Sequence, residues 1–177
     1  MNNIIPYSAS LQELAHSFDC GNSYLNNFLN STDSLNNSIA KTYVFLTEDE
    51  DAIIGYYSIT TGCITSADEQ ASWKIGGSVH ISDLAVDKRY HRWHTAEENE
   101  ENQISISDIL LADCIDRIRH LQDFLGFAFI TLNSTSRGRS LYERNGFEEI
   151  DEDMRIPSEE LEVDCTPMYL ALEILDY

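Results

Sequence analysis

The 177-residue chain is long enough to bury a core, and its 42% hydrophobic content is globular rather than disordered. Asp and Glu number 31 against 11 Lys and Arg, which gives a formal net charge of −20. Because non-specific binding to nucleic acid relies on basic residues that neutralise phosphates, this charge disfavours nucleic acid as a partner and favours cationic ligands or basic proteins.

Targeting and redox signals are few. No apolar run approaches the roughly 20 residues that span a bilayer, and the N-terminus has no secretory signal. The four cysteines stand far apart without CxxC spacing, which is typical of reduced thiols. We therefore expect a cytoplasmic protein without membrane contact, folded as a single domain over residues 1–177.

The first half of the chain predicts helices followed by strands. Apolar residues recur at helical spacing over 11–18 and 24–29. Segments 42–46 and 53–64 are rich in β-branched and aromatic residues, and the acidic run 48–51 between them is typical of a solvated turn. Residues 79–86 predict a further strand.

The second half alternates helices and strands. After a polar, acid-rich stretch over 88–103, apolar spacing predicts an amphipathic helix over 107–121, with Ser105 or Ser107 as its cap and Asp108 in its first turn. A strand over 127–132, a helix over 136–145 closed by Gly146, and strands over 147–150 and 168–175 follow. This order predicts an α/β (α+β) fold with helices on the faces of a sheet.

Three stretches carry a resemblance to a known family. They are Phe18-Asp19-Cys20-Gly21 with the following residues 24–29, then Leu84-Ala85-Val86-Asp87, and then Leu141-Tyr142-Glu143-Arg144-Asn145-Gly146-Phe147. Together they resemble the GNAT N-acetyltransferase superfamily, and the first, with the strand 55–59, resembles its branch of toxin-like acetyltransferases from toxin–antitoxin pairs. The resemblance implies a mostly antiparallel sheet of about six or seven strands, splayed after Val86, with helices on both faces.

The resemblance also implies a site for acetyl-CoA. The backbone of Leu84, Ala85 and Val86 would pair with the pantetheine arm, and the start of the following helix would receive the pyrophosphate. The implied cofactor-binding residues are Leu84, Ala85, Val86, Ser105, Ile106, Ser107, Asp108, Asn133 and Arg137. Tyr142 would assist the leaving thiolate; the alternative is a core aromatic that anchors its helix.

The sequence departs from the family where its phosphate loop should be. The family has glycines after the strand, whereas residues 88–94 contain none, and an insertion with four glutamates over 97–101 follows. Six of the 11 basic residues, at positions 88, 89, 92, 137, 139 and 144, lie in two places that border the cofactor phosphates in the family. Local positive charge on an acidic chain favours an anion site; the alternative is solvated charge at turns and helix ends.

Metal chemistry is not expected. His91 and His94 stand near Glu97 and Glu98, but the spacing is not specific to a metal site and no Cys is near. We expect no metal, and neither of the other carboxylate runs has the character of a catalytic pair.

Two functions remain open at this point. The first is an acyl-CoA-dependent N-acetyltransferase that transfers an acetyl group to a small cationic amine, a peptide or a protein lysine. The second is a catalytically degenerate GNAT-fold protein that binds a basic partner. The general base is not identified, with Asp83, His80 and a water chain all open, and a homodimer is compatible with either function.

Overall fold

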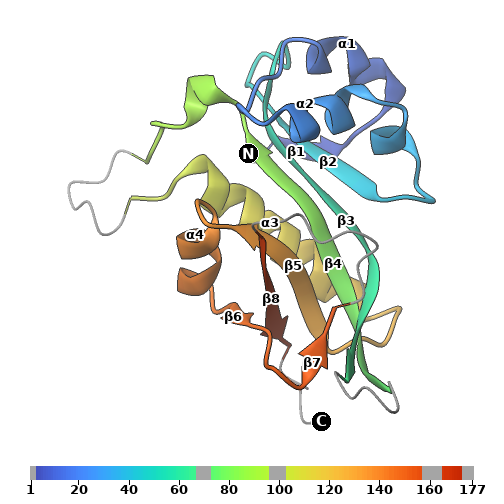
Figure 1. Ribbon diagram of the computed structural model, residues 1–177. Helices are drawn as coiled ribbons and strands as arrows, with labels where there is room; N and C mark the ends of the chain where they lie inside the picture. Colours follow the sequence, from blue (N-terminus) through green and yellow to red (C-terminus); the bar gives the residue numbers. More distant parts are fainter. Residues whose placement is uncertain (1–2, 67–72, 96–102, 157–164, 173–177) are drawn as a thin grey trace. The chain divides into compact units, whose positions relative to one another are not determined.

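The computed structural model describes residues 3–66, 73–95, 103–156 and 165–172. These residues form two compact units, one of residues 1–59 and 82–116 and the other of 60–81 and 117–177. Hydrogen bonding orders the strands β1-β2-β3-β4-β5-β8-β6, with β7 beside β3 (Figure 1). Strands β3 (Ile53–Ser66) and β4 (Lys74–Val86) each pass from one unit into the other.

The first unit is built on an antiparallel ladder. Strand β1 (Ile4–Pro6) pairs with β2 (Lys41–Leu46), which pairs with the first part of β3. Between β1 and β2 lie the 3₁₀ turns Ala9–Leu11 and Asp33–Leu35 and the helices α1 (Gln12–Ala15) and α2 (Ser23–Asn30). Helix α2 begins after Asn22, whose side chain accepts the N–H groups of Tyr24 and Leu25, as expected of an N-cap asparagine.

Consecutive tyrosines of β3 show that helices cover both faces of the sheet in the first unit. The Tyr56 hydroxyl donates to the carbonyl of Leu25 in α2, at 2.8 Å. The next residue, Tyr57, donates to Asp113 of α3 (Ile106–Leu121), at 2.6 Å. Because successive side chains of a strand point to opposite faces, α2 and α3 lie on opposite sides of β3. The helices on both faces expected from the sequence are thereby confirmed in this unit.

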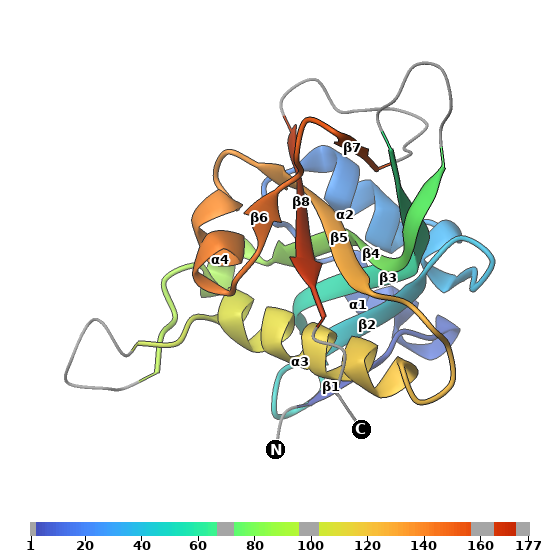
Figure 2. The same cartoon turned by 90° about the horizontal axis from the view of Figure 1, so that it is seen from below.

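The second unit contains the one parallel ladder among the described strand pairs. Strand β5 (Phe129–Thr135) pairs parallel with β4 and antiparallel with β8 (Cys165–Ala171), which pairs with β6 (Glu148–Glu149). Strand β7 (Met154–Arg155) pairs with the end of β3. Helix α4 (Arg139–Arg144) lies between β5 and β6 in the chain (Figure 2) and ends before Gly146, at a φ of 84° that favours glycine.

The mixed, mostly antiparallel α+β fold is as predicted, but several boundaries differ. Within the described residues the sheet has eight strands rather than six or seven, because the short β1 and β7 carry too few residues for a pattern. The helix expected over 11–18 is a 3₁₀ turn followed by the four-residue α1. The β4–β5 ladder ends at Ile81↔Leu132, whereas divergence was expected only after Val86. No helix in the described ranges is long and apolar enough to cross a membrane.

Candidate functional site

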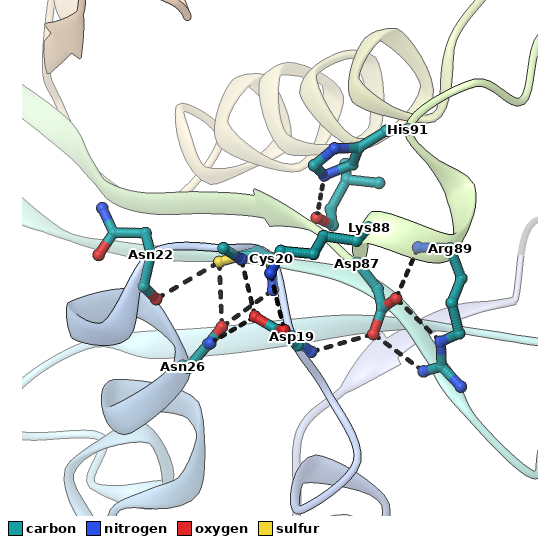
Figure 3. A network of polar contacts seen from close by, with 10 residues as sticks. Asp19, Cys20, Asn22, Asn26, Asp87, Lys88, Arg89 and His91 are labelled. Atoms are coloured by element: carbon teal, nitrogen blue, oxygen red, sulfur yellow. Dashed lines mark hydrogen bonds and ion pairs between the residues drawn. The ribbon is translucent and has the colours of Figure 1, made fainter.

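The last carbonyl of β4 is bound by a side chain. Ala85 and Val86 are buried, and Leu84 is half-buried. The Val86 carbonyl lies 2.8 Å from His91 Nε2, so this nitrogen must carry a proton and donate it (Figure 3). The backbone N–H of Asp87 donates to the Ile54 carbonyl of β3. The sequence predicted free backbone groups here, and the Val86 carbonyl already has a hydrogen-bond partner within the protein.

Asp87 is the centre of the polar network that follows β4. Its side chain is 2% exposed, and both of its oxygens are 2.9 Å from the Arg89 guanidinium. It also accepts the backbone N–H groups of Arg89 and Asp19 (Figure 3). Burial raises the pKa of the Asp87 carboxyl, but these hydrogen bonds outweigh burial and leave the pKa below its usual value. The network fixes the loop of residues 18–21 to the end of β4.

Three of the six basic residues expected near the cofactor phosphates pair with carboxylates. Lys88 lies 2.9 Å from Asp19, whose pKa is lowered to about 2, chiefly by the hydrogen bond from Lys88. Arg139 of α4 pairs with Glu143 and Glu149. These basic residues therefore neutralise neighbouring acids, which favours the solvated-charge interpretation for them over an anion site.

The start of α3 is a capping box. The Ser105 hydroxyl accepts the Asp108 N–H at 3.3 Å and donates to the Asp108 carboxylate at 2.5 Å, while the Ser105 N–H donates to the same oxygen at 3.0 Å. Ser105 is thus the cap, one of the two residues expected for it, and Ile106 and Ser107 begin the helix. The Asp108 carboxylate lies at the positive end of the helix dipole, where a phosphate would otherwise be favoured.

The residues just before α3 form the stem of a hairpin. His94 and Ser105 make an antiparallel bridge, the Thr95 N–H donates to the Ile104 carbonyl, and the Ile104 N–H donates to the Thr95 hydroxyl. The acidic residues 97–101 lie outside the described residues. This pairing holds the chain that follows the β4 turn next to the start of α3.

Three further predicted residues lie in the second unit. Asn133 of β5 has a buried side-chain oxygen with no hydrogen-bond partner among the described residues, and Arg137 is exposed in the turn before α4. Tyr142 is 8% exposed and packs edge-on against Phe147, with ring centroids 5.7 Å apart. The structure therefore places Leu84–Val86 and Ser105–Asp108 in the first unit, and Asn133, Arg137 and Tyr142 in the second.

No group of three or more His, Cys, Asp or Glu side chains in the described part of the chain is arranged to hold a metal ion. His91 donates to a backbone carbonyl, and Glu97 and Glu98 lie outside the described residues. Sequence reasoning missed the Asp19–Asp87 network, because its members stand 68 positions apart in the chain. The one local signal was the short Asp87-Lys88-Arg89 run, in which a carboxylate precedes two cations.

Solved structures share this architecture. The chain matches the crystal structure of a bacterial toxin at 17% identity and a TM-score of 0.66, covering 97% of this chain and 92% of the other. It matches a structure of AtaTR bound with acetyl-CoA at 17% identity and a TM-score of 0.69, with 95% and 92% covered. It matches AtaT complexed with acetyl-methionyl-tRNAfMet at 17% identity and a TM-score of 0.68, with 95% and 93% covered.

Comparison by amino-acid sequence alone finds no match. No protein-family model matches the chain, and no curated protein matches it. At 17% identity, the structural likeness concerns the fold. The fold expected from the three motifs is confirmed at that level, because this chain and AtaT share their architecture over most of their lengths.

Proposed function

We propose that this protein is an acetyl-CoA-dependent N-acetyltransferase. The observation that carries the proposal is the shared fold together with the start of α3, which follows the β4 loop and presents first-turn N–H groups. The first N–H groups of a helix have no partner within the helix and favour anions. The N–H groups of Ile106 and Ser107 would hold the pyrophosphate of acetyl-CoA.

The start of α3 suits a pyrophosphate in its backbone N–H groups but not in its charge. Ser105 and Asp108 shape the first turn of α3, so its N–H groups are preorganised. The Asp108 carboxylate, however, repels a phosphate at the same place, and the first turn has no basic residue to offset it. We therefore expect weak binding of acetyl-CoA, strengthened when the Asp108 charge is removed.

The remaining predicted residues have roles that follow from the resemblance. Leu84, Ala85 and Val86 would pair with the pantetheine arm through backbone groups other than the Val86 carbonyl, which His91 already uses. Tyr142 would donate a hydrogen bond to the departing thiolate. A phenol of pKa ~10 donates to a thiolate of conjugate pKa ~8.5 without full proton transfer, which would be uphill by about 2 kcal/mol. Asn133 and Arg137 remain proposed contacts of the cofactor.

The net charge of the chain guides the choice of the amine that would accept the acetyl group. AtaT has been captured with acetyl-methionyl-tRNAfMet, so an aminoacyl-tRNA is one candidate acceptor. A net charge of −20 repels tRNA and attracts cations, which favours a small cationic amine, a peptide or a protein lysine. A second function, binding of a basic partner without catalysis, is favoured by the carboxylate at the start of α3 and by the structure of AtaT bound to the C-terminus of the antitoxin AtaR.

The experiment is release of free CoA thiol from acetyl-CoA, measured with spermidine, a lysine-containing peptide and methionyl-tRNA as acceptors. Transfer to spermidine or to the peptide, exceeding transfer to the tRNA, supports the proposal. Dominant transfer to methionyl-tRNA would refute the choice of acceptor while keeping the activity. No thiol release with any acceptor would favour the partner-binding function.

A further inference from the structure

The carbonyl of Val86 points to the edge of β4 that faces away from β3. The next residue, Asp87, donates its N–H to the Ile54 carbonyl of β3. Because the hydrogen-bonding groups of successive strand residues point to opposite edges, the groups of Val86 point away from β3. On that edge the ladder with β5 ends at Ile81↔Leu132, before Val86 is reached. The Val86 carbonyl is therefore an edge acceptor, of the kind that pairs with the amide of an extended ligand.

A short turn brings His91 back to this carbonyl. Lys88–Tyr90 form a 3₁₀ turn, with Asp87 as its N-cap and His91 as its C-cap. The Asp87 carbonyl accepts the Tyr90 N–H at 2.9 Å, which closes the turn. The reversed chain places His91 Nε2 2.8 Å from the Val86 carbonyl, with the proton on that nitrogen (Figure 3). The contact follows from the turn built around Asp87.

The imidazole of His91 is held by little else. The residue is exposed, and within the described part of the chain its side chain makes this one hydrogen bond. An exposed side chain gives up such a bond at little cost, because water replaces the partner. Rotation of the side chain to another rotamer would free the carbonyl without changing the backbone of the turn. The contact between His91 and Val86 is therefore reversible.

We propose that His91 is an autoinhibitory residue of the acetyl-CoA site, which the pantetheine arm must displace before it pairs with the Val86 carbonyl. The inference rests on the proposed acetyltransferase function and adds a competing side chain to its cofactor site. A carbonyl oxygen has two lone pairs, but a ring nitrogen at 2.8 Å leaves little room beside it for a second donor. Binding of the arm therefore exchanges the hydrogen bond from His91 for one from a pantetheine amide.

His91 and Asp108 would oppose different parts of acetyl-CoA. The Asp108 carboxylate is fixed at the start of α3, where its charge repels the pyrophosphate. His91 occupies a backbone acceptor of the pantetheine arm and adds no negative charge. ADP carries a pyrophosphate without the arm, and S-acetylpantetheine carries the arm without a phosphate. Binding of these two fragments therefore separates the two effects.

The test is calorimetric titration of His91→Ala and His91→Gln with acetyl-CoA and with both fragments. We expect His91→Ala to bind acetyl-CoA and S-acetylpantetheine about 3- to 10-fold more tightly, with ADP affinity and melting temperature unchanged, because one exposed hydrogen bond is lost. His91→Gln keeps a donor and should remain close to the wild type. The matched control His94→Ala removes an exposed imidazole nearby, leaves the backbone bridge to Ser105, and should change none of the three affinities.

Two further measurements are independent of these variants. Asp108→Asn should tighten ADP and acetyl-CoA but not S-acetylpantetheine, and its gain for acetyl-CoA should multiply with that of His91→Ala in the double variant. Nitrogen NMR of the wild-type protein follows the His91 ring directly. The Nε2 signal should change when S-acetylpantetheine displaces it from the Val86 carbonyl, and it should stay the same when ADP binds.

The outcomes separate this inference from the function on which it rests. Equal or weaker affinity of His91→Ala for acetyl-CoA, with an unchanged His91 ring signal on binding, would refute the role of His91 alone. Tighter binding of ADP to His91→Ala would also refute it, since the ring would then act on the phosphates. Absence of acetyl-CoA binding in the wild type, in His91→Ala and in Asp108→Asn would refute the proposed function, and the His91 inference with it.

Discussion

Replacing Asp108 by Asn should strengthen the binding of acetyl-CoA while weakening the fold. The substitution keeps the size of the side chain and removes the negative charge that accepts from Ser105 at the start of α3. Removing a repulsive charge favours the pyrophosphate, and losing the capping carboxylate disfavours the helix. The two effects have opposite signs and are measured separately.

The magnitudes follow from the geometry of the first turn. Two unit charges 4 Å apart interact by about 1 kcal/mol in bulk water and by about 4 kcal/mol at an effective dielectric constant near 20. Taking the exposed limit, we expect acetyl-CoA to bind about 5- to 10-fold more tightly to Asp108→Asn. The loss of the charged capping box should lower the free energy of unfolding by about 1 kcal/mol.

The assay is calorimetric titration with acetyl-CoA, together with thermal unfolding. Asp116→Asn is the matched control, because it removes the same charge from an exposed position of α3. The two positions are about 12 Å apart along a helix, beyond the screening length of ~10 Å at 0.1 M salt. Equal tightening in both variants would show that only net charge matters, and no tightening in Asp108→Asn would refute phosphate binding at this helix start.

Three other substitutions test separate parts of the account. Tyr142→Phe should reduce turnover about 100-fold with little change in melting temperature, since the ring still packs on Phe147; unchanged turnover would assign Tyr142 to packing alone. Replacing residues 96–102 by Gly-Gly should leave the fold intact and tighten acetyl-CoA binding, as measured by circular dichroism and calorimetry; loss of the fold would refute the reasoning from the closed stem. The pKa of Asp87 is lowered in the folded protein, so its carboxylate contributes its full stabilisation of the fold above the unfolded pKa of ~3.9. This contribution is lost as the pH falls through the pKa of the folded protein. Asp87→Asn should therefore lower the free energy of unfolding by about 2 kcal/mol at neutral pH and reduce its dependence on pH in the acid range. Urea titrations that show the same dependence on acid pH in both proteins would contradict the role given to this network.

Periodicity predicted most of the fold. Helix α3 was expected to within one residue at its start, because its apolar spacing is regular and serine and aspartate mark the cap. Strands β2 and β3 followed from β-branched and aromatic runs. The length of the four-residue α1 was overestimated, since the apolar spacing over 11–18 continues beyond the hydrogen-bonded turn.

The site was less predictable, because its interactions join distant parts of the chain. The family resemblance and local positive charge placed Lys88 and Arg89 near phosphates, whereas Asp19 and Asp87 engage both. The His91 donation to the Val86 carbonyl has no sequence signal, since it depends on the path of the turn after β4. Asp108 was expected in the first turn of α3, and only the structure shows its carboxylate fixed by Ser105.

Calorimetric titration of the intact protein with acetyl-CoA, at low and at moderate salt, tests the central claim most directly. The account predicts one molecule bound per chain with weak affinity, together with a gain in affinity when Asp108 is replaced by Asn. Moderate salt should strengthen binding to the intact protein, because screening reduces repulsion between the bound phosphates and an acidic chain. Absence of binding in the intact protein and in Asp108→Asn, at either salt concentration, would contradict the acetyltransferase function.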